Sequence, residues 1–390
     1  MNLHEFQAKE LLASYGLPTP GGKVAITADQ AGAIAAELGS PIIAVKAQVH
    51  AGARGKAGGI QLVHSASEAK VAAAKLLGKK LVTAQTGAAG RIVKRLYLEV
   101  GVERVRDLYI ALLIDGSTGQ VTLLGAAKGG DDIEERAARG ELKLERLSLG
   151  DGRTRRADEV KVFASRIRVD AGSVNAFETI IDGLRRAFVE LDASLIEINP
   201  LAVLRDGSFQ ALDVKMVLED NALFRHPELA ALRDEDEIDQ REVQAQRHQL
   251  NYVSMDGNIG LVANGAGLGL ATVDLVSAAG GRPGNFMDIR TTATSLDVAY
   301  GFGLLLDNPA LKAIFLNVHG GGMQPCDTIA EGLGIAMRRT GRSLPVVARL
   351  AGNNAEFARD RFVSFGCKVE NYPDMWSAAT RVVALAQKGA

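Results

Sequence analysis

The first 240 residues alternate amphipathic helical stretches with short runs of β-branched and apolar residues. Residues 1–16 have the periodicity of an amphipathic helix. Strand-like runs follow at residues 41–48, 95–100, 107–115, 120–126, 194–204 and 209–216. Turn-forming sequences at 115–120 and 205–208 separate neighbouring runs in the way that hairpin loops do. The pattern predicts that much of this half is antiparallel or mixed sheet.

After residue 250 the pattern changes to a strict alternation of apolar strands and helices. Five strand–helix pairs in about 140 residues predict an open, doubly wound parallel sheet with helices on both faces. Ligands of such sheets bind beyond the carboxyl ends of the strands. The charged segment 226–249 has no strand pattern, and we interpret it as the crossing between domains. We therefore predict an α/β protein with an α+β domain at 1–238 and a parallel-sheet domain at 239–390.

Composition narrows the classes of function. Lys and Arg total 45 and Asp and Glu total 46, which gives a formal charge of −1 and no basic excess for a nucleic-acid backbone. Two cysteines cannot form a disulfide framework, which fits a reducing cytoplasm. The first helix lacks the apolar core of a signal peptide, and no apolar run reads as a membrane span. We expect a cytoplasmic protein that binds neither nucleic acid nor membrane.

The loop at residues 49–59 combines cations with glycines. Lys46 ends the apolar strand before it, and Arg54 and Lys56 lie among the glycines. Phosphates favour this combination, because a lysine supplies a point charge and glycine amides can close over a polyphosphate. The loop fails the Walker A template, since Ala57 follows the Gly-Lys pair. A solvated glycine loop is the alternative.

A predicted hairpin brings three polar residues together. Glu197 and Asn199 are two apart on a strand and so share a face. If the loop is 205–207 with its glycine in the left-handed region, Asn199 lies opposite Asp213. Two oxygen ligands on a rigid sheet suit Mg²⁺, which completes its octahedron with water and phosphate oxygens. A surface hairpin with scattered acids is the alternative.

Two glycine-rich turns follow strands in the second half. The turn at 264–269, with Asp288 at the end of the next strand, partly mimics a dinucleotide-binding fingerprint, but position 270 is Leu. The turn at 319–322 also leads into a helix, whose amino end could hold an anion. A nicotinamide oxidoreductase is therefore an alternative hypothesis.

Together these features resemble the family of the β subunit of succinyl-CoA synthetase and its relative malate–CoA ligase. The match extends over nearly the whole chain, and its specific stretches are residues 1–20, 45–59, 195–201, 220–225 and 251–268. The resemblance implies an ATP-grasp half followed by a flavodoxin-like CoA-ligase half. It implies the reaction of a carboxylic acid, CoA and ATP to acyl-CoA, ADP and phosphate. It also implies a partner α subunit, in an αβ or α2β2 assembly, that carries the CoA site and a phosphohistidine.

The resemblance also implies roles for individual residues in the nucleotide half. The ATP phosphates would be held by Lys46, Ala53, Arg54 and Gly55. Glu99 and Asp107 would line the nucleotide pocket, and Asn199 and Asp213 would hold Mg²⁺.

Further roles concern the partner and the acid. Glu197 would steady the α-subunit histidine while it accepts the phosphoryl group. The small carboxylic acid and the phosphohistidine would face Asn264, Gly321, Gly322 and Met323.

The chain departs from the family near the expected acyl site. Residues 290–292 read Arg-Thr-Thr where the family usually has glycines, and the loop 320–325 carries Gln324-Pro325 in place of an arginine. These departures leave succinate, malate and other small dicarboxylates open as the acid. They also leave open a regulatory ATP-binding subunit without ligase turnover. Smaller departures are Ala53 for glycine, Asp107 for glutamate and Lys128 for glutamate.

Overall fold

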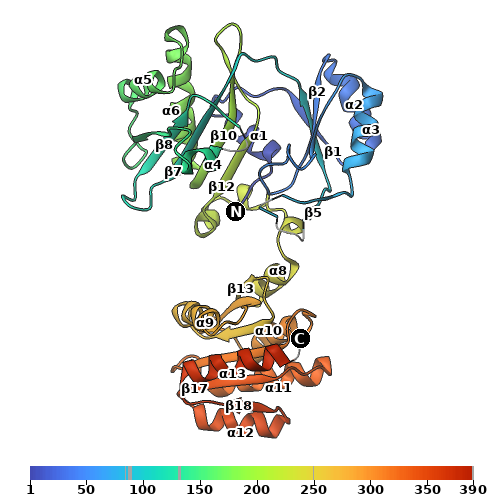
Figure 1. Cartoon of the computed structure of the whole chain (residues 1–390), viewed down its shortest axis with the longest axis vertical. Coiled ribbons are helices and arrows are strands. Elements are labelled where there is room, and N and C mark those ends of the chain that lie inside the picture. The colour runs from blue at the N-terminus through green and yellow to red at the C-terminus, as the bar shows by residue number, and fades with distance from the viewer. Residues whose placement is uncertain (84, 87–89, 131–132, 249, 389–390) are drawn as a thin grey trace. The chain divides into compact units, whose positions relative to one another are not determined.

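The computed structural model describes residues 1–390 except 84, 87–89, 131–132, 249 and 389–390. The chain divides into two compact units, Met1–Glu237 and Ile238–Ala390, which are described separately below (Figure 1). Among the described residues, no helix has both the length and the apolar character that crossing a bilayer requires.

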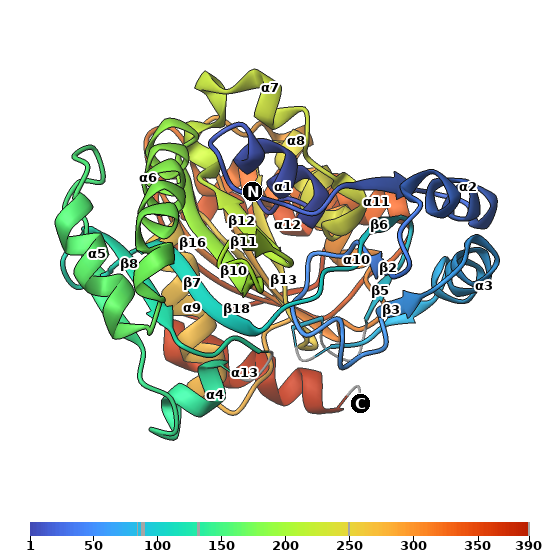
Figure 2. The same cartoon turned by 90° about the horizontal axis from the view of Figure 1, so that it is seen from above.

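The first unit contains a four-stranded antiparallel sheet in the order β1-β6-β2-β3. Its strands are Gly22–Ala25 (β1), Leu96–Val100 (β6), Ile43–Ala47 (β2) and Ile60–Val63 (β3), and its helices are Ala28–Leu38 (α2) and Ala66–Leu76 (α3). Helices α2 and α3 lie against this sheet (Figure 2). The faces that they bury are rich in alanine. A short antiparallel pair of strands, β4 (Lys80–Leu81) and β5 (Arg91–Ile92), lies between α3 and β6 in the sequence.

The second sheet of this unit is antiparallel, in the order β11-β10-β7-β8-β9, with β12 also paired to β10. Its strands are Phe209–Ala211 (β11), Ala193–Val203 (β10), Arg106–Ile114 (β7), Val121–Ala126 (β8), Glu145–Ser148 (β9) and Val214–Leu218 (β12). One face packs on helices Ala157–Arg166 (α5) and Val174–Glu190 (α6), which Figure 2 shows side by side. Ile133, at the start of α4 (Ile133–Ala138), packs on the other face.

Helix α1 (Glu5–Ala13) belongs to the core of the second sheet. Its residues Ala8 and Leu12 are fully buried there, and the backbone amide of Leu3 donates to the carbonyl of Met216 on β12, at 3.1 Å. Glu5 and Lys9 continue this buried stripe, because each lies three residues before one of its members, Ala8 and Leu12 respectively.

The predicted hairpin register is confirmed. Leu201 pairs with Ala211 and Ile198 pairs with Val214, so Asn199 lies opposite Asp213. The amide of Asn199 donates to the carbonyl of Asp213 at 3.0 Å. Gly207 has φ +82°, the left-handed conformation that closes the three-residue loop.

The remaining elements of the first unit connect it to the second. They are Asp220–Arg225 (η2), Pro227–Ala230 (α7) and Glu235–Glu237 (η3), whereas the short turn Ala171–Ser173 (η1) lies between α5 and α6. The predicted crossing at 226–249 therefore contains short helical turns, and its last helix, Gln240–Arg247 (α8), belongs to the second unit.

The second unit is a six-stranded sheet in the order β13-β15-β14-β16-β17-β18. The strands are Leu250–Ser254 (β13), Asn285–Ile289 (β15), Ile259–Ala263 (β14), Ala313–Gly320 (β16), Val346–Gly352 (β17) and Val369–Asn371 (β18). From β15 onward the strands are parallel and follow the flavodoxin order, as predicted. Strand β13 is antiparallel, so the expectation of a purely parallel sheet was wrong at this edge.

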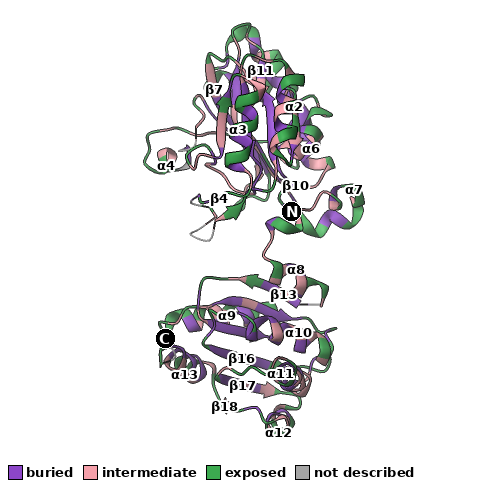
Figure 3. Cartoon of the chain, turned by 90° about the vertical axis from the view of Figure 1, so that its right-hand side faces the viewer, coloured by how far each residue is buried: buried purple, intermediate pink, exposed green. Residues whose placement is uncertain are grey.

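Both faces of this sheet are covered (Figure 3). The helices are Ala266–Ala278 (α9), Ser295–Leu306 (α10), Cys326–Thr340 (α11), Ala355–Phe365 (α12) and Met375–Lys388 (α13). One apolar cluster joins the sheet to α10, α11 and α12, and a separate one joins it to α9 and α13. Strands buried on both faces explain the continuous apolar runs of the sequence.

Candidate functional site

The first unit contains a cavity of about 740 Å³, lined by strands of the second sheet and by the loop that follows β2 of the first sheet. The loop after β2 contributes Ala53, Arg54 and Lys56, and β10 contributes Glu197 and Asn199. Other lining residues are Glu5, His50, Gln85, Gly130, Glu135, Asp213 and Lys215. The two sequence motifs of this half, far apart along the chain, therefore meet at one cavity.

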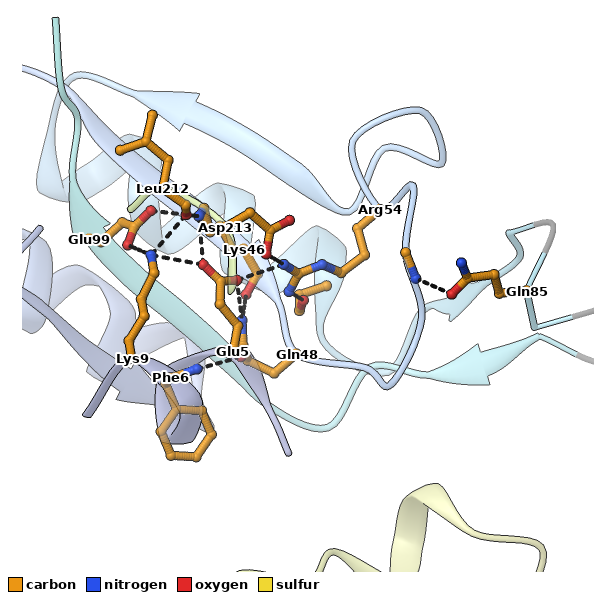
Figure 4. Close-up of polar contacts among 12 residues, drawn as sticks. Glu5, Phe6, Lys9, Lys46, Gln48, Arg54, Gln85, Glu99, Leu212 and Asp213 are labelled. Atoms are coloured by element: carbon orange, nitrogen blue, oxygen red, sulfur yellow. Dashed lines mark hydrogen bonds and ion pairs between the residues drawn. The ribbon is translucent and has the colours of Figure 1, made fainter. Parts of the chain in front are cut away.

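Six charged residues form a network beside the cavity, which we call the ion-pair cluster (Figure 4). Its members are Glu5, Lys9, Lys46, Arg54, Glu99 and Asp213. Lys46 Nζ lies 2.7 Å from Glu5 Oε1 and 2.5 Å from Glu99 Oε1. Lys9 Nζ lies 2.9 Å from the same Glu5 oxygen. All members except Asp213 are at least nine-tenths buried.

Burial of so many charges is tolerated because each has an opposite partner. Burial alone would raise the pKa of Glu5, but its attraction to Lys46, Lys9 and Arg54 is stronger and holds that pKa well below its usual value. Burial disfavours the charged form of Lys46, yet Glu5 and Glu99 raise its pKa. For Glu99 burial prevails over Lys46 and Lys9, so its pKa is raised. Lys46 therefore stays charged at any physiological pH.

The loop after β2 is built so that Arg54 points into this cluster. Its Nη2 donates to Glu5 Oε2 at 2.6 Å and to Asp213 Oδ1 at 2.7 Å, and its Nη1 donates to the carbonyl of Ala47 at 2.8 Å. Ala53 has φ +56°, a left-handed conformation that alanine adopts at a cost. Arg54 is 6 % exposed and so is not the solvated charge of the alternative hypothesis, whereas Lys56 is exposed.

Asn199 and Asp213, the predicted magnesium ligands, both line the cavity. Asn199 Oδ1 accepts from the amide of Gly130 at 2.8 Å, and its Nδ2 donates to the carbonyl of Gly130 at 3.0 Å. Asp213 is 38 % exposed, and one of its oxygens faces Arg54. A carboxylate and an amide oxygen fit a hard cation that keeps several water or phosphate ligands. The described residues contain no group of three or more His, Cys, Asp or Glu that could hold a metal.

The other predicted residues of this half lie in different surroundings. Glu197 lines the cavity, on β10 opposite Lys215. Glu99 lies behind the cavity within the ion-pair cluster. Asp107, at the start of β7, pairs with Arg104 at 2.8 Å and is not among the lining residues that the structure describes.

In the second unit the predicted acyl-site residues gather at the carboxyl ends of β14 and β16. Asn264 Nδ2 donates to the carbonyl of His319 at 2.8 Å, and the amide of His319 donates to Asn264 Oδ1 at 2.8 Å. This pair of bonds joins the two strand ends where the strand order reverses, the usual ligand position in such sheets. Gly321, Gly322 and Met323 form the following turn, in which Met323 is 71 % exposed.

The residues that depart from the family also lie at these strand ends. Arg290 Nη2 donates to Asn251 Oδ1 at 2.8 Å, and Asn251 Nδ2 donates to Asp288 Oδ2 at 3.1 Å. Asp288 Oδ1 accepts from the amide of Gly265 at 2.6 Å. Gln324 is 3 % exposed, and among the described contacts its Nε2 has no hydrogen-bond partner. This edge of the unit therefore presents a guanidinium and a buried carboxamide beside the glycine turns.

Sequence reasoning missed Glu5 and Lys9. Both sit on α1, about 40 residues before Lys46, and a Glu–Lys pair spaced by four usually marks a solvated helix face. The only signal was that the pair continues the apolar stripe of Ala8 and Leu12.

Comparison with known proteins gives the same division of the chain. Residues 2–203 match the family model of the ATP-grasp domain, and residues 262–367 match that of the CoA-ligase domain. The β subunit of ADP-forming succinate–CoA ligase from Geobacillus kaustophilus (strain HTA426) is 43% identical over 385 residues, covering 99% of this chain and 100% of that protein. The corresponding subunit from Burkholderia vietnamiensis (strain G4 / LMG 22486) is 42% identical over 386 residues, with 99% of each covered.

A solved structure shares the fold over the whole chain. ATP citrate lyase from Methanothrix soehngenii, in complex with citrate and coenzyme A, superimposes with a TM-score of 0.73 at 17% identity and covers 99% of both chains. At that identity the likeness concerns the fold alone. The predicted order of an ATP-grasp half before a CoA-ligase half is confirmed.

Proposed function

Because the chain belongs to the family of ADP-forming succinate–CoA ligase β subunits, we propose that it is the nucleotide-binding subunit of an enzyme that joins a small carboxylic acid to CoA. The reaction consumes ATP and gives acyl-CoA, ADP and phosphate. The observation that carries the proposal is the cavity of the first unit, where the glycine loop, Glu197 and Asp213 meet beside buried cations. ATP and ADP bind in this cavity.

The chemistry of the cavity suits phosphoryl transfer, which depends on positioning and charge neutralisation. In the proposal, Lys46 and the loop of Ala53, Arg54 and Gly55 hold the phosphates. Glu99 holds the Lys46 ammonium group from behind the cavity. The resemblance assigns Asp107 to the nucleotide pocket as well, although here it pairs with Arg104 outside the described cavity lining.

Asn199 and Asp213 would hold Mg²⁺ together with phosphate oxygens and water. When bound there, the ion supplies positive charge that neutralises the phosphates. Two properties of this chain support the assignment. The hairpin register fixes the two residues opposite each other, and Asp213 keeps a partly exposed carboxylate on the cavity wall.

The proposal assigns the nucleophile to a partner. An α subunit contributes the CoA site and a histidine that is phosphorylated in turn, in an αβ or α2β2 assembly. Glu197 steadies that histidine, and Asn264, Gly321, Gly322 and Met323 face the acid and the phosphohistidine. Two findings support this assignment: the relatives are β subunits, and these loops lie where the strand order reverses.

The acid in the proposal is a small dicarboxylate or an analogue with a second anionic group, with succinate first and malate next. Arg290 brings a donor to a strand end where bare glycine backbone is expected, which favours an acid with an additional acceptor.

The direct test is turnover by the chain co-expressed with its α subunit. ADP release should require CoA, Mg²⁺ and one acid from a panel of short mono- and dicarboxylates. Absence of CoA-dependent ADP release with every acid would contradict the ligase proposal and favour the regulatory alternative.

A variant tests which feature of the chain determines the preferred acid. Arg290→Gly should change the order of preference among the acids while ATP binding stays the same. An unchanged order of preference would show that Arg290 does not contribute to selection of the acid. A titration in which the chain binds NADH but not ATP would instead favour the oxidoreductase alternative.

A further inference from the structure

One carboxylate holds both phosphate-site cations of the first unit. Glu5 Oε1 accepts from Lys46 Nζ at 2.7 Å, while Glu5 Oε2 accepts from Arg54 Nη2 at 2.6 Å (Figure 4). Lys46 comes from a strand and Arg54 from the loop after it. Figure 4 shows the Glu5 carboxylate between the two cationic groups, so each of its oxygens serves a different cation.

The helix that carries Glu5 is fixed independently of these cations. Ala8 and Leu12 of α1 are fully buried in the core of the second sheet, whereas Lys46 lies on β2 of the first sheet. The position of the Glu5 carboxylate is therefore set by packing against one sheet, and it acts on cations that belong to the other.

We infer that Glu5 is a positioning residue for nucleotide binding: with its two oxygens it fixes Lys46 and Arg54 in the places from which they meet the phosphates. The inference rests on the proposed function, because it assigns the cavity to a nucleotide. Glu5 does not contact the substrate in this role, and its effect passes through the two cations.

The sign of the effect separates positioning from simple charge. The ion-pair cluster contains three cations and three carboxylates. Replacing Glu5 by glutamine removes one negative charge and makes the cluster more attractive to an anionic nucleotide. Lost positioning has the opposite consequence, because misplaced cations bind the phosphates less well.

The test measures ADP binding to the complete chain with its α subunit, in the presence of Mg²⁺. Glu5→Gln should weaken ADP binding by about tenfold or more. Phosphorylation of the α subunit by acyl-CoA and phosphate, which needs no nucleotide, should change by less than about twofold by the same argument. Glu10→Gln is the matched control, because Glu10 is exposed on the same helix, and it should change neither measurement.

Glu5→Asp keeps the charge and shortens the side chain by one carbon, so one carboxylate can no longer reach both cations. It should weaken ADP binding even if Glu5→Gln fails to fold. ADP binding as tight as wild type in Glu5→Asp, or equal or tighter binding in a folded Glu5→Gln, would overturn the inference. If the wild-type pair itself binds no nucleotide, the proposed function fails instead.

Discussion

The two units present their candidate sites in different ways. In the first unit, the candidate site consists of charged side chains that are buried and mutually paired, such as Lys46 and Glu5. In the second, the candidate site consists of glycine turns and of hydrogen bonds between a side chain and the backbone, such as those of Asn264 with His319. The first site should therefore be sensitive to the loss of a charge, and the second to a change in backbone conformation.

The largest expected effect is at Lys46. Lys46→Met should lower the free energy of unfolding by about 3–5 kcal/mol, because Glu5 and Glu99 would lose a buried partner. Nucleotide binding should be lost as well. Urea unfolding followed by far-UV circular dichroism measures the whole chain, and the fluorescence of Trp376, the only tryptophan, reports on the second unit.

Lys23 provides the control for this change. It pairs with Glu37 on the surface, where both side chains are more than half exposed. Lys23→Met should change stability by about 0–1 kcal/mol. Equal losses in the two variants would contradict the distinction between buried and exposed charges.

The next effect concerns pH. Burial, then repulsion by a protonated His4, lowers the pKa of His50 from 6.5 to about 4. The folded state thus binds this proton more weakly than the unfolded state, so its stability is complete above pH 6.5 and declines as the pH falls towards 4. A loss on the order of 2 kcal/mol is expected over this range. Unfolding of wild type and His50→Asn at several pH values measures it.

The groups that face His50 also titrate or carry charge, and they are His4, Arg91, Arg95, Asp234 and Glu237. The His50→Asn variant isolates the histidine from them. If its stability falls between pH 6.5 and 4 as steeply as that of wild type, the dependence belongs to these neighbours.

A backbone change tests the second unit. Gly265 has φ +104° and ψ 126° at the start of α9, and an added Cβ would meet no atom within 4 Å. Gly265→Ala should cost about 1–3 kcal/mol through backbone strain alone. Gly267→Ala, in the same helix without a positive φ, should be neutral or stabilising. Urea unfolding followed by the fluorescence of Trp376 measures both variants. Equal free energies of unfolding would contradict the prediction.

The smallest expected effect on stability comes from replacing alanine by glycine in the first unit, the opposite of the Gly265→Ala change. Ala53→Gly should raise stability by about 0.5 kcal/mol, since relief of the left-handed alanine at φ +56° exceeds the entropy that glycine loses on folding. Thermal unfolding can resolve this change. A clear loss of stability would mean that the methyl group of Ala53 packs favourably.

Local patterns were enough to predict much of the fold. The hairpin register could be predicted because one glycine at position 207 determines the loop length, and that length determines which face Asp213 occupies. The antiparallel direction of β13 was not predicted, because its partner β15 follows in the chain only after β14 and α9, and no local pattern indicates that pairing. The five parallel strands were predictable because burial on both faces leaves continuous apolar runs.

The candidate site was predictable only where motif and cavity coincide. Lys46, Asn199 and Asp213 stood in recognisable patterns. The roles of Glu5 and Lys9 depend on a helix that packs on one sheet and reaches the other, and no local pattern encodes that contact. Asp107, expected at the pocket, turned out to pair with Arg104, its neighbour three residues before.

Helix α1 connects the two sheets of the first unit through buried groups on both sides. If one sheet pivoted against the other at this point, Glu5 would separate from Lys46 while both stay buried. The free-energy cost of leaving these charges unpaired would be several kcal/mol. The cationic groups are consequently preorganised when the chain folds. An arriving ligand meets them already ordered, and its affinity is not reduced by the entropy of immobilising long side chains.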